Sequence, residues 1–153
     1  MPTPSYATIV DEIRASADAY DVEALSASDL AYLKSLDLPD DVIAFYESHA
    51  PSAEVHVNDI YLLNVASMRE EHERCEPGLT LRTQDCVVVM RTGGGEPYFL
   101  ARVDDGYRII LGVDGQLGET KDETIANSSE GPSFDSFAKL LEAFAGSTLP
   151  SHG

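Results

Sequence analysis

The sequence has few cysteines, few basic residues and no tryptophan. Its 153 residues include two cysteines, and 10 Lys and Arg stand against 27 Asp and Glu, which gives a net charge of −17. Two cysteines, Cys75 and Cys86, are too few for a disulfide framework. Strong negative charge repels the phosphates of nucleic acids and of anionic membranes. These shortages argue against a disulfide-rich secreted scaffold, and they predict a protein that binds neither nucleic acid nor membrane.

Long hydrophobic runs are also missing. No apolar stretch approaches the roughly 20 residues of a membrane-spanning helix. The opening residues, MPTPSYATIVDEIR, lack a basic start and an unbroken apolar run, so no signal peptide is expected. The length is that of about one domain, and 43% hydrophobic residues can form a core without disulfide or metal. We therefore predict a single cytoplasmic domain over residues 1–153.

The first third of the chain has the pattern of helices. Residues 4–20, 26–38 and 38–51 place apolar side chains at the three- and four-residue steps of amphipathic helices. We expect Ser28 to cap the second helix. Pro39 is expected at the start of the third, where its missing N–H costs nothing.

The middle of the chain has the pattern of strands. Alternating and β-branched residues predict strand at 54–65, a polar stretch predicts an exposed helix over 66–75, and three apolar segments joined by turn residues predict a meander. Those segments are CVVVMRT (86–92), PYFLARV (97–103) and YRIILGV (107–113). The polar connection 114–131 is expected to hold at most one edge strand.

The three glycines at 93–95 raise the question of a phosphate-binding loop. Such a loop needs Gly-Lys-Ser/Thr opening into a helix, so that backbone amides and the lysine meet the phosphates. Here Glu96 and Pro97 follow, and then a strand. An acid has the wrong charge for that role, and no helix start follows to hold an anion. The pattern therefore favours the tip of a hairpin.

The end of the chain predicts one strongly amphipathic helix. In GPSFDSFAKLLEAFAG (131–146), apolar residues from Phe134 to Phe144 recur at three- and four-residue steps. Ser133 can cap this helix and Gly146 can end it. Its apolar face requires a covering surface, and the meander offers one. The sequence thus predicts an α+β fold: an antiparallel meander sheet flanked by N-terminal helices and by this closing C-terminal helix.

No catalytic or metal-binding motif stands out. His72 and Cys75 could share a helix face, but two ligands are too few for a structural zinc site. Cys86 begins an apolar strand, where a buried inert thiol is expected. Adjacent carboxylates do not face each other across a cleft, as glycosidase chemistry requires. We therefore predict no catalytic residue, no metal and no cofactor.

Three stretches resemble the SUKH superfamily, which includes yeast cell-wall-synthesis regulators and many bacterial immunity proteins. They are LPDDVIAFYESHAP, NDIYLLNVASMREE, and GGEPYFLARVDDGYRIILGVDG with the later SFDSFAKLLEAF. The resemblance covers about residues 30–145, with residues 1–29 as an N-terminal helical extension. It implies an α+β domain without catalytic residues, and in bacteria a protein that binds and neutralises a cognate toxin, often a nuclease or deaminase.

The charge of the chain agrees with that implied role. A toxin that attacks nucleic acid needs a basic surface, and an acidic protein can cover such a surface. The candidate partner-binding acids are Glu70, Glu71 and Glu73 on the polar helix and Asp104 and Asp105 at a turn. Acidity also keeps a protein soluble and can reflect the host organism. Two other functions remain open: an adaptor or regulator with a non-toxin partner, and a small enzyme that uses carboxylates in a cleft.

Overall fold

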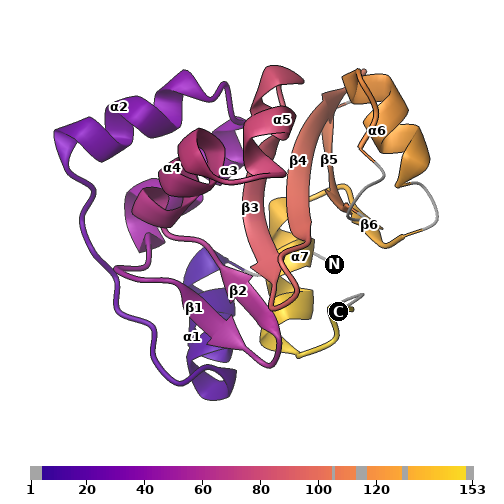
Figure 1. The fold of residues 1–153 in the computed structure, drawn as a ribbon. Coiled ribbons are helices and arrows are strands. Elements are labelled where there is room, and N and C mark those ends of the chain that lie inside the picture. Colours follow the sequence, from indigo (N-terminus) through magenta and orange to yellow (C-terminus); the bar gives the residue numbers. More distant parts are fainter. Residues whose placement is uncertain (1–4, 105, 113–116, 129–130, 151–153) are drawn as a thin grey trace.

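The structure, a computed structural model, describes residues 5–104, 106–112, 117–128 and 131–150. Within these ranges the chain forms seven helices and one six-stranded sheet, so the predicted α+β class is confirmed (Figure 1). The helices are α1 (Tyr6–Ser16), α2 (Ala27–Ser35), α3 (Asp40–His49), α4 (Val65–Arg74), α5 (Gly78–Thr83), α6 (Lys121–Asn127) and α7 (Phe137–Ala145). The strands are β1 (Val55–Val57), β2 (Ile60–Leu62), β3 (Val87–Thr92), β4 (Pro97–Val103), β5 (Gly106–Leu111) and β6 (Ser133–Phe134).

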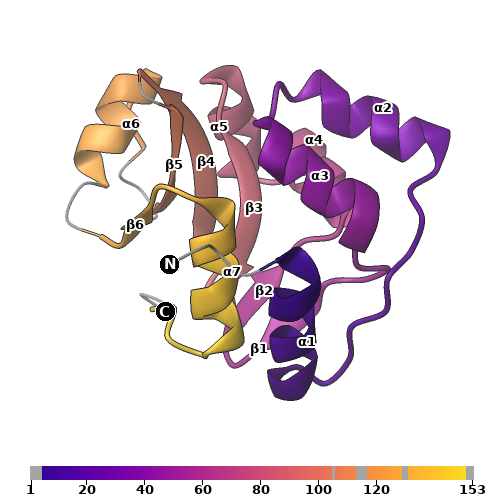
Figure 2. The same cartoon turned by 180° about the vertical axis from the view of Figure 1, so that it is seen from behind.

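The sheet is an antiparallel meander in which β1 to β6 lie side by side in chain order. Helices α1 and α7 cover one face, and α4 and α5 lie on the other (Figures 1 and 2). Because both faces are covered, residues 87–90 of β3 and 97–101 of β4 are buried without interruption. Two-sided burial explains why these strands are continuous apolar runs rather than alternating ones.

An aromatic cluster joins the three helices α1, α3 and α7. The ring of Phe45 lies 5.2 Å, centroid to centroid, from both Tyr6 and Phe137, edge to face in each case. The Tyr6 hydroxyl also donates a hydrogen bond of 3.0 Å to the carbonyl oxygen of Asp41. Helix α1, which we assigned to an N-terminal extension, therefore packs into the same buried cluster as the rest of the domain.

The closing helix α7 is present, but it begins later than predicted. Ser136, rather than Ser133, is the N-cap, and its hydroxyl accepts a hydrogen bond from the Lys139 amide at 3.2 Å. Phe134 lies in β6 and is half-buried. The predicted end at Gly146 is confirmed. The first residues of the expected helix instead form the short strand β6, which pairs with β5.

Other element boundaries also differ from the sequence prediction. Ser26, not Ser28, caps α2, with its hydroxyl 3.1 Å from the Asp29 amide. The expected strand at 54–65 divides into β1 and β2 and stops at Leu62. The Asn64 side chain accepts from the Ser67 amide at 3.2 Å and thereby starts α4. Capping by these side chains decides the boundaries that apolar periodicity left open.

Two short helices were missed. Helix α6 occupies the connection for which we expected at most one edge strand, and the edge strand β6 lies just after it. Thr120 caps α6, and Asp122 and Glu123 lie in its first turn, where they favour the helix dipole. Helix α5 was not predicted at all. Both helices are too short and too polar to show a clear apolar period.

Candidate functional site

The glycines at 93–95 form the hairpin turn between β3 and β4, as predicted. The Gly95 amide donates to the carbonyl oxygen of Thr92 at 2.9 Å, and Gly95 has a φ of 90°, which favours glycine. A Cβ on Gly93 would overlap the Asp59 side chain, which would have to move to admit a larger residue. The glycines thus serve a tight turn packed against the β1–β2 turn.

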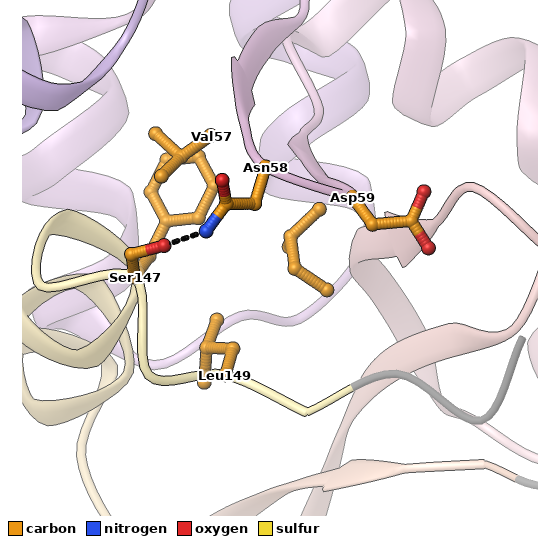
Figure 3. Close-up of a pocket in the computed structure, with 7 residues that line it drawn as sticks. Val57, Asn58, Asp59, Ser147 and Leu149 are labelled. Carbon is orange, nitrogen blue, oxygen red and sulfur yellow. Dashed lines mark hydrogen bonds between the residues drawn. The ribbon is translucent and has the colours of Figure 1, made fainter.

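A small pocket lies between the β1–β2 turn and the segment after α7 (Figure 3). Its volume is about 60 Å³, and the Asn58 side chain donates a hydrogen bond to the Ser147 hydroxyl across it. The carboxylate of Asp59 points away from that contact in Figure 3. Sites for small molecules have volumes of roughly 300–1,000 Å³, so this pocket is too small to hold a substrate.

Two of the predicted partner-binding acids are exposed on α4. Glu70 and Glu73 both face solvent. The Glu73 carboxylate, however, forms an ion pair with Arg69 at 3.4 Å, and Arg74 also lies on this helix. The local charge is therefore nearly balanced, and α4 by itself does not make a strongly acidic surface.

The third predicted acid on this helix, Glu71, is buried, so the helix is not exposed along its whole length as we expected. Glu71 is 8% exposed and its neighbour His72 is 4% exposed. Burial raises the pKa of the Glu71 carboxyl; nearby Arg91 opposes the rise and Glu54 adds to it. The buried positions Val65, Met68 and His72 repeat at helical steps. This helical spacing could have indicated the buried face of α4 in the sequence. It was overlooked because two of the buried positions hold the polar residues Glu71 and His72.

His72 has a structural position between α2 and the sheet. Its Nε2 accepts a hydrogen bond from the Val88 amide at 2.8 Å, beside an irregularity in the β3–β4 pairing. Nε2 must therefore be unprotonated, and Nδ1–H donates to the Tyr32 hydroxyl, 2.9 Å away. Burial, aided by the charge of Arg82, lowers the pKa of His72 to about 4. The imidazole is thus neutral at pH 7 and joins three elements.

The turn acids lie elsewhere on the molecule. Asp104 is exposed at the end of β4 and borders a cleft together with Arg102 and Lys121. Asp105 lies outside the described residues. Strands β3 to β5 separate α4 from α6 in both Figures 1 and 2, so the structure does not bring Asp104 together with Glu70 and Glu73.

The strongest concentration of acids is in the N-terminal third. Residues 5–59 contain 12 acidic and 2 basic residues, and 10 of these acids are exposed. Eight of them occur on α1, on α3 and on the segment between α1 and α2, which lie together on one side of the molecule (Figure 2), while Asp37 and Asp59 lie elsewhere. We define the acidic surface as Asp11, Glu12, Asp18, Asp21, Glu23, Asp40 and Glu47. The sequence signal for it was the excess of acids in the first half of the chain.

Backbone and side-chain hydrogen bonds hold this surface in place. The segment after α1 pairs with residues 50–52: the Glu23 amide donates to the Ala50 carbonyl, and the Ser52 amide to the Asp21 carbonyl, at 2.8 Å each. The Tyr20 hydroxyl donates to the His49 carbonyl at 2.5 Å. The acids between α1 and α2 are therefore fixed to the end of α3 rather than carried on a loose loop.

An apolar side chain lies among these acids. Val22 is 44% exposed and forms an isolated β-bridge with Pro51, between the acidic neighbours Asp21 and Glu23. Arg14 is the basic residue of this region, and it forms an ion pair with Asp11 at 3.4 Å. An exposed valine between two acidic neighbours in the chain matches the composition of a protein-binding surface, which combines apolar contacts with polar groups.

We next considered the cysteines and histidines that the structure describes as possible metal ligands. In the described ranges, no group of three or more His, Cys, Asp and Glu could hold a metal ion. Cys86 is buried, and its burial raises the pKa of the thiol to about 11, with the charges of Lys121 and Arg82 opposing the rise. A thiol with that pKa is almost entirely protonated at pH 7 and is a poor nucleophile.

No helix among the described residues is long and apolar enough to cross a membrane. Comparisons of the chain with known protein families, with curated proteins and with solved structures find no match.

Proposed function

We propose that this chain is a non-catalytic binding protein of the SUKH type, and that it neutralises a cognate toxin of the nuclease or deaminase kind. On this proposal the acidic surface covers a basic surface of the partner and blocks it. No bond of the partner is broken or formed.

The observation that carries the proposal is the uneven distribution of charge. Residues 5–59 carry 12 acids against 2 bases, while the rest of the chain carries 15 against 8. Exposed carboxylates that repel one another add little to folding stability, and a concentration of them raises the association rate with a basic protein. Val22 supplies an apolar contact within the same surface.

The ordered backbone beneath the acids also supports the proposal. Binding requires interface side chains to be ordered, and that loss of freedom weakens affinity. On this surface, α1, α3 and the paired segments 21–23 and 50–52 hold the carboxylates before any partner arrives. A partner with matching positive charge would therefore meet a prepared surface.

The test is capture of a partner from the source organism at low salt, with three proteins as bait. The first is the wild-type chain, and the second carries Glu12→Lys, Glu23→Lys and Glu47→Lys on the acidic surface. The third is a control with the same change in charge, Glu70→Lys, Asp104→Lys and Glu119→Lys, on other exposed positions.

We expect a Lys- and Arg-rich protein that the wild type and the control retain and the acidic-surface variant loses. An enzyme that acts on nucleic acid or nucleobases, inhibited by the wild-type chain, would support the toxin assignment. A basic partner without such activity would instead support an adaptor of the same fold. Equal retention by all three baits would remove the acidic surface as the binding site.

A further inference from the structure

A cleft that contains three basic side chains lies at one end of the sheet, between α5 and α6 and across the ends of β3 and β4 (Figure 1). It consists of two parts of about 310 and 430 Å³, and Arg102 and Lys121 line both. Arg82 lines the first part, which reaches the end of α2. The second part also contains Asp104 and Asp122 against Arg102 and Lys121, so it has no net charge, and we call the first part alone the cationic trough. Its size is that of a small-molecule site.

The trough collects three of the ten basic residues of a very acidic chain. The lining of the trough contains Arg82, Arg102 and Lys121 against two acids, Asp37 and Asp85. One net positive charge at this position contrasts with a net charge of −17 for the whole chain. Over both parts of the cleft the lining has three basic and four acidic residues, so the excess of cations is confined to the trough.

The three cations have different partners. Arg102 donates from Nε to the Asp37 carbonyl oxygen at 2.9 Å, and the same nitrogen lies 3.5 Å from the Asp37 carboxylate. Arg82 and Lys121 are half-buried, and neither forms an ion pair with a carboxylate of the described ranges. Arg82 makes a long hydrogen bond of 3.4 Å to the Cys86 carbonyl oxygen. Two partly desolvated cations thus keep most of their hydrogen-bonding capacity.

Apolar side chains also line the cleft. Leu36, Val87 and Leu100 border the trough, and Val103 and Ile125 border the second part of the cleft. A polyanion such as phosphate would place several charges close to Asp85. A single carboxylate would need only the two half-buried cations, and an attached apolar group could contact the leucines and valines.

We propose that the cationic trough binds a carboxylate carried on a small apolar body, with Arg82 and Lys121 contacting the carboxylate. This carboxylate belongs either to a free organic acid or to the C-terminus of a peptide. The inference is independent of the acidic surface and of the proposed function, because no residue is shared between the two.

The polar contacts around α6 give the trough a fixed wall. The Thr124 hydroxyl donates to the Gln84 side chain at 2.6 Å and accepts from the Gly118 amide at 3.0 Å. The Gln84 side chain donates in turn to the Gly118 carbonyl at 2.7 Å. These contacts tie α6, which carries Lys121, to the end of α5, which carries Arg82, so the two cations face the cleft from fixed positions.

The test is a titration of the 15N-labelled full chain followed by NMR. The probes are sodium benzoate, the neutral analogue benzamide, and inorganic phosphate. We expect benzoate to shift the amide signals of Asp37, Arg102 and Lys121, and to bind about tenfold more tightly than benzamide, because a charged hydrogen bond is lost in the analogue. Phosphate should bind more weakly than benzoate. Acetyl-Ala-Phe is then tested with a free and with an amidated C-terminus. Binding of the free form alone would indicate a peptide C-terminus as the source of the carboxylate, and binding of neither form would indicate a free organic acid.

Substitutions separate the trough from general charge effects. Arg82→Gln and Lys121→Gln should each weaken benzoate binding about tenfold. Arg74→Gln removes an exposed cation of α4 outside the trough and should leave affinity unchanged within about twofold. If Arg82→Gln does not fold, Lys121→Gln on the partly exposed start of α6 keeps the test decisive. Equal binding of benzamide, or equal affinity in all three variants, would overturn the proposal.

Discussion

On the acidic surface, seven exposed carboxylates of α1, α3 and the segment between α1 and α2 are accompanied by one arginine. In the cationic trough, three basic side chains gather around two acids. The acidic surface is built on α1, α3 and the segment between α1 and α2, and the trough is a cleft at the end of the sheet. The two regions therefore suit different ligands: a basic protein surface for the first, and a small carboxylate for the second.

The two regions also rest on different kinds of support. Beneath the acidic surface, Phe45 packs against Tyr6 and Phe137 at 5.2 Å each, so the support is largely apolar. Beside the trough, the hydrogen bonds among Gln84, Thr124 and Gly118 supply the support. We therefore expect a change to the aromatic cluster to cost more stability than a change to the polar contacts.

The largest effect is expected from Phe45→Ala. Removing this fully buried ring leaves a cavity among α1, α3 and α7, and we expect the free energy of unfolding to fall by about 3–5 kcal/mol. Urea denaturation measures the change. Val22→Ala is the control, because Val22 is 44% exposed, and it should shift stability by less than about 1 kcal/mol. Similar losses for both substitutions would show that the cluster is not the main support.

A pH-dependent effect is expected next, at His72. Its pKa is about 4 in the folded protein and 6.5 as the reference for the unfolded chain. Between these values the unfolded chain binds more protons, so stability is intact above pH 6.5 and is lost as the pH falls toward 4. The shift corresponds to about 3 kcal/mol.

The measurement compares wild type with His72→Gln by urea denaturation from pH 7.5 to 4. Subtracting the two curves removes the titration of carboxyls such as Glu71, whose raised pKa acts in the opposite direction. We expect the stability advantage of the wild type to shrink as the pH falls. A constant difference across this range would mean that His72 is not held neutral by burial.

A smaller effect is expected from Thr124→Val beside the trough. The substitution keeps the shape of the side chain but leaves the Gln84 side-chain oxygen and the Gly118 amide without this partner. We expect a loss of about 1–3 kcal/mol in thermal or urea unfolding. Thr80→Val on α5 offers a half-buried threonine outside this group as a comparison. If Thr124→Val left the free energy of unfolding unchanged, water would be replacing the hydroxyl as the hydrogen-bond partner.

The smallest effect on stability is expected from reversing charge on the acidic surface. Glu47→Lys replaces one of several exposed acids by a base, and we expect a change within about 0.5 kcal/mol. At low salt we expect Glu47→Lys to raise stability slightly, because it relieves repulsion between carboxylates. At high salt this gain should disappear. Glu73→Lys, which removes an ion pair with Arg69 at 3.4 Å, should instead be neutral or slightly unfavourable. Destabilisation by Glu47→Lys would show that these carboxylates serve the fold.

Apolar pattern was the part of the fold that the sequence predicted well. The stripe that ends at Phe144 identified α7, and the runs around Val88 and Phe99 identified the central strands. Such apolar patterns are stable only when they are buried in a helix or strand of matching period. Helix α6 was missed because seven residues with the single large apolar side chain Ile125 show no period. The start of α7 was misplaced because both Ser133 and Ser136 can cap, and only strand pairing decides between them.

The candidate site was harder to predict for a physical reason. Charge counts showed an acidic first half, but they did not show which acids lie beside bases. Glu70 and Glu73 were chosen from a polar run, and the fold places Arg69 and Arg74 among them. The trough brings Arg82, Arg102 and Lys121 together from α5, β4 and α6, and no local pattern marks residues so far apart in the chain.

The central claim is that the acidic surface binds a basic partner, and the association rate as a function of salt tests it most directly. With the captured partner, stopped-flow measurements would compare wild type, the Glu12→Lys, Glu23→Lys, Glu47→Lys variant, and the Glu70→Lys, Asp104→Lys, Glu119→Lys control. We expect wild type and control to associate faster as salt is lowered, and the acidic-surface variant to associate at least about tenfold more slowly with little salt dependence. Equal rates and equal salt dependence for the two triple variants would contradict the account.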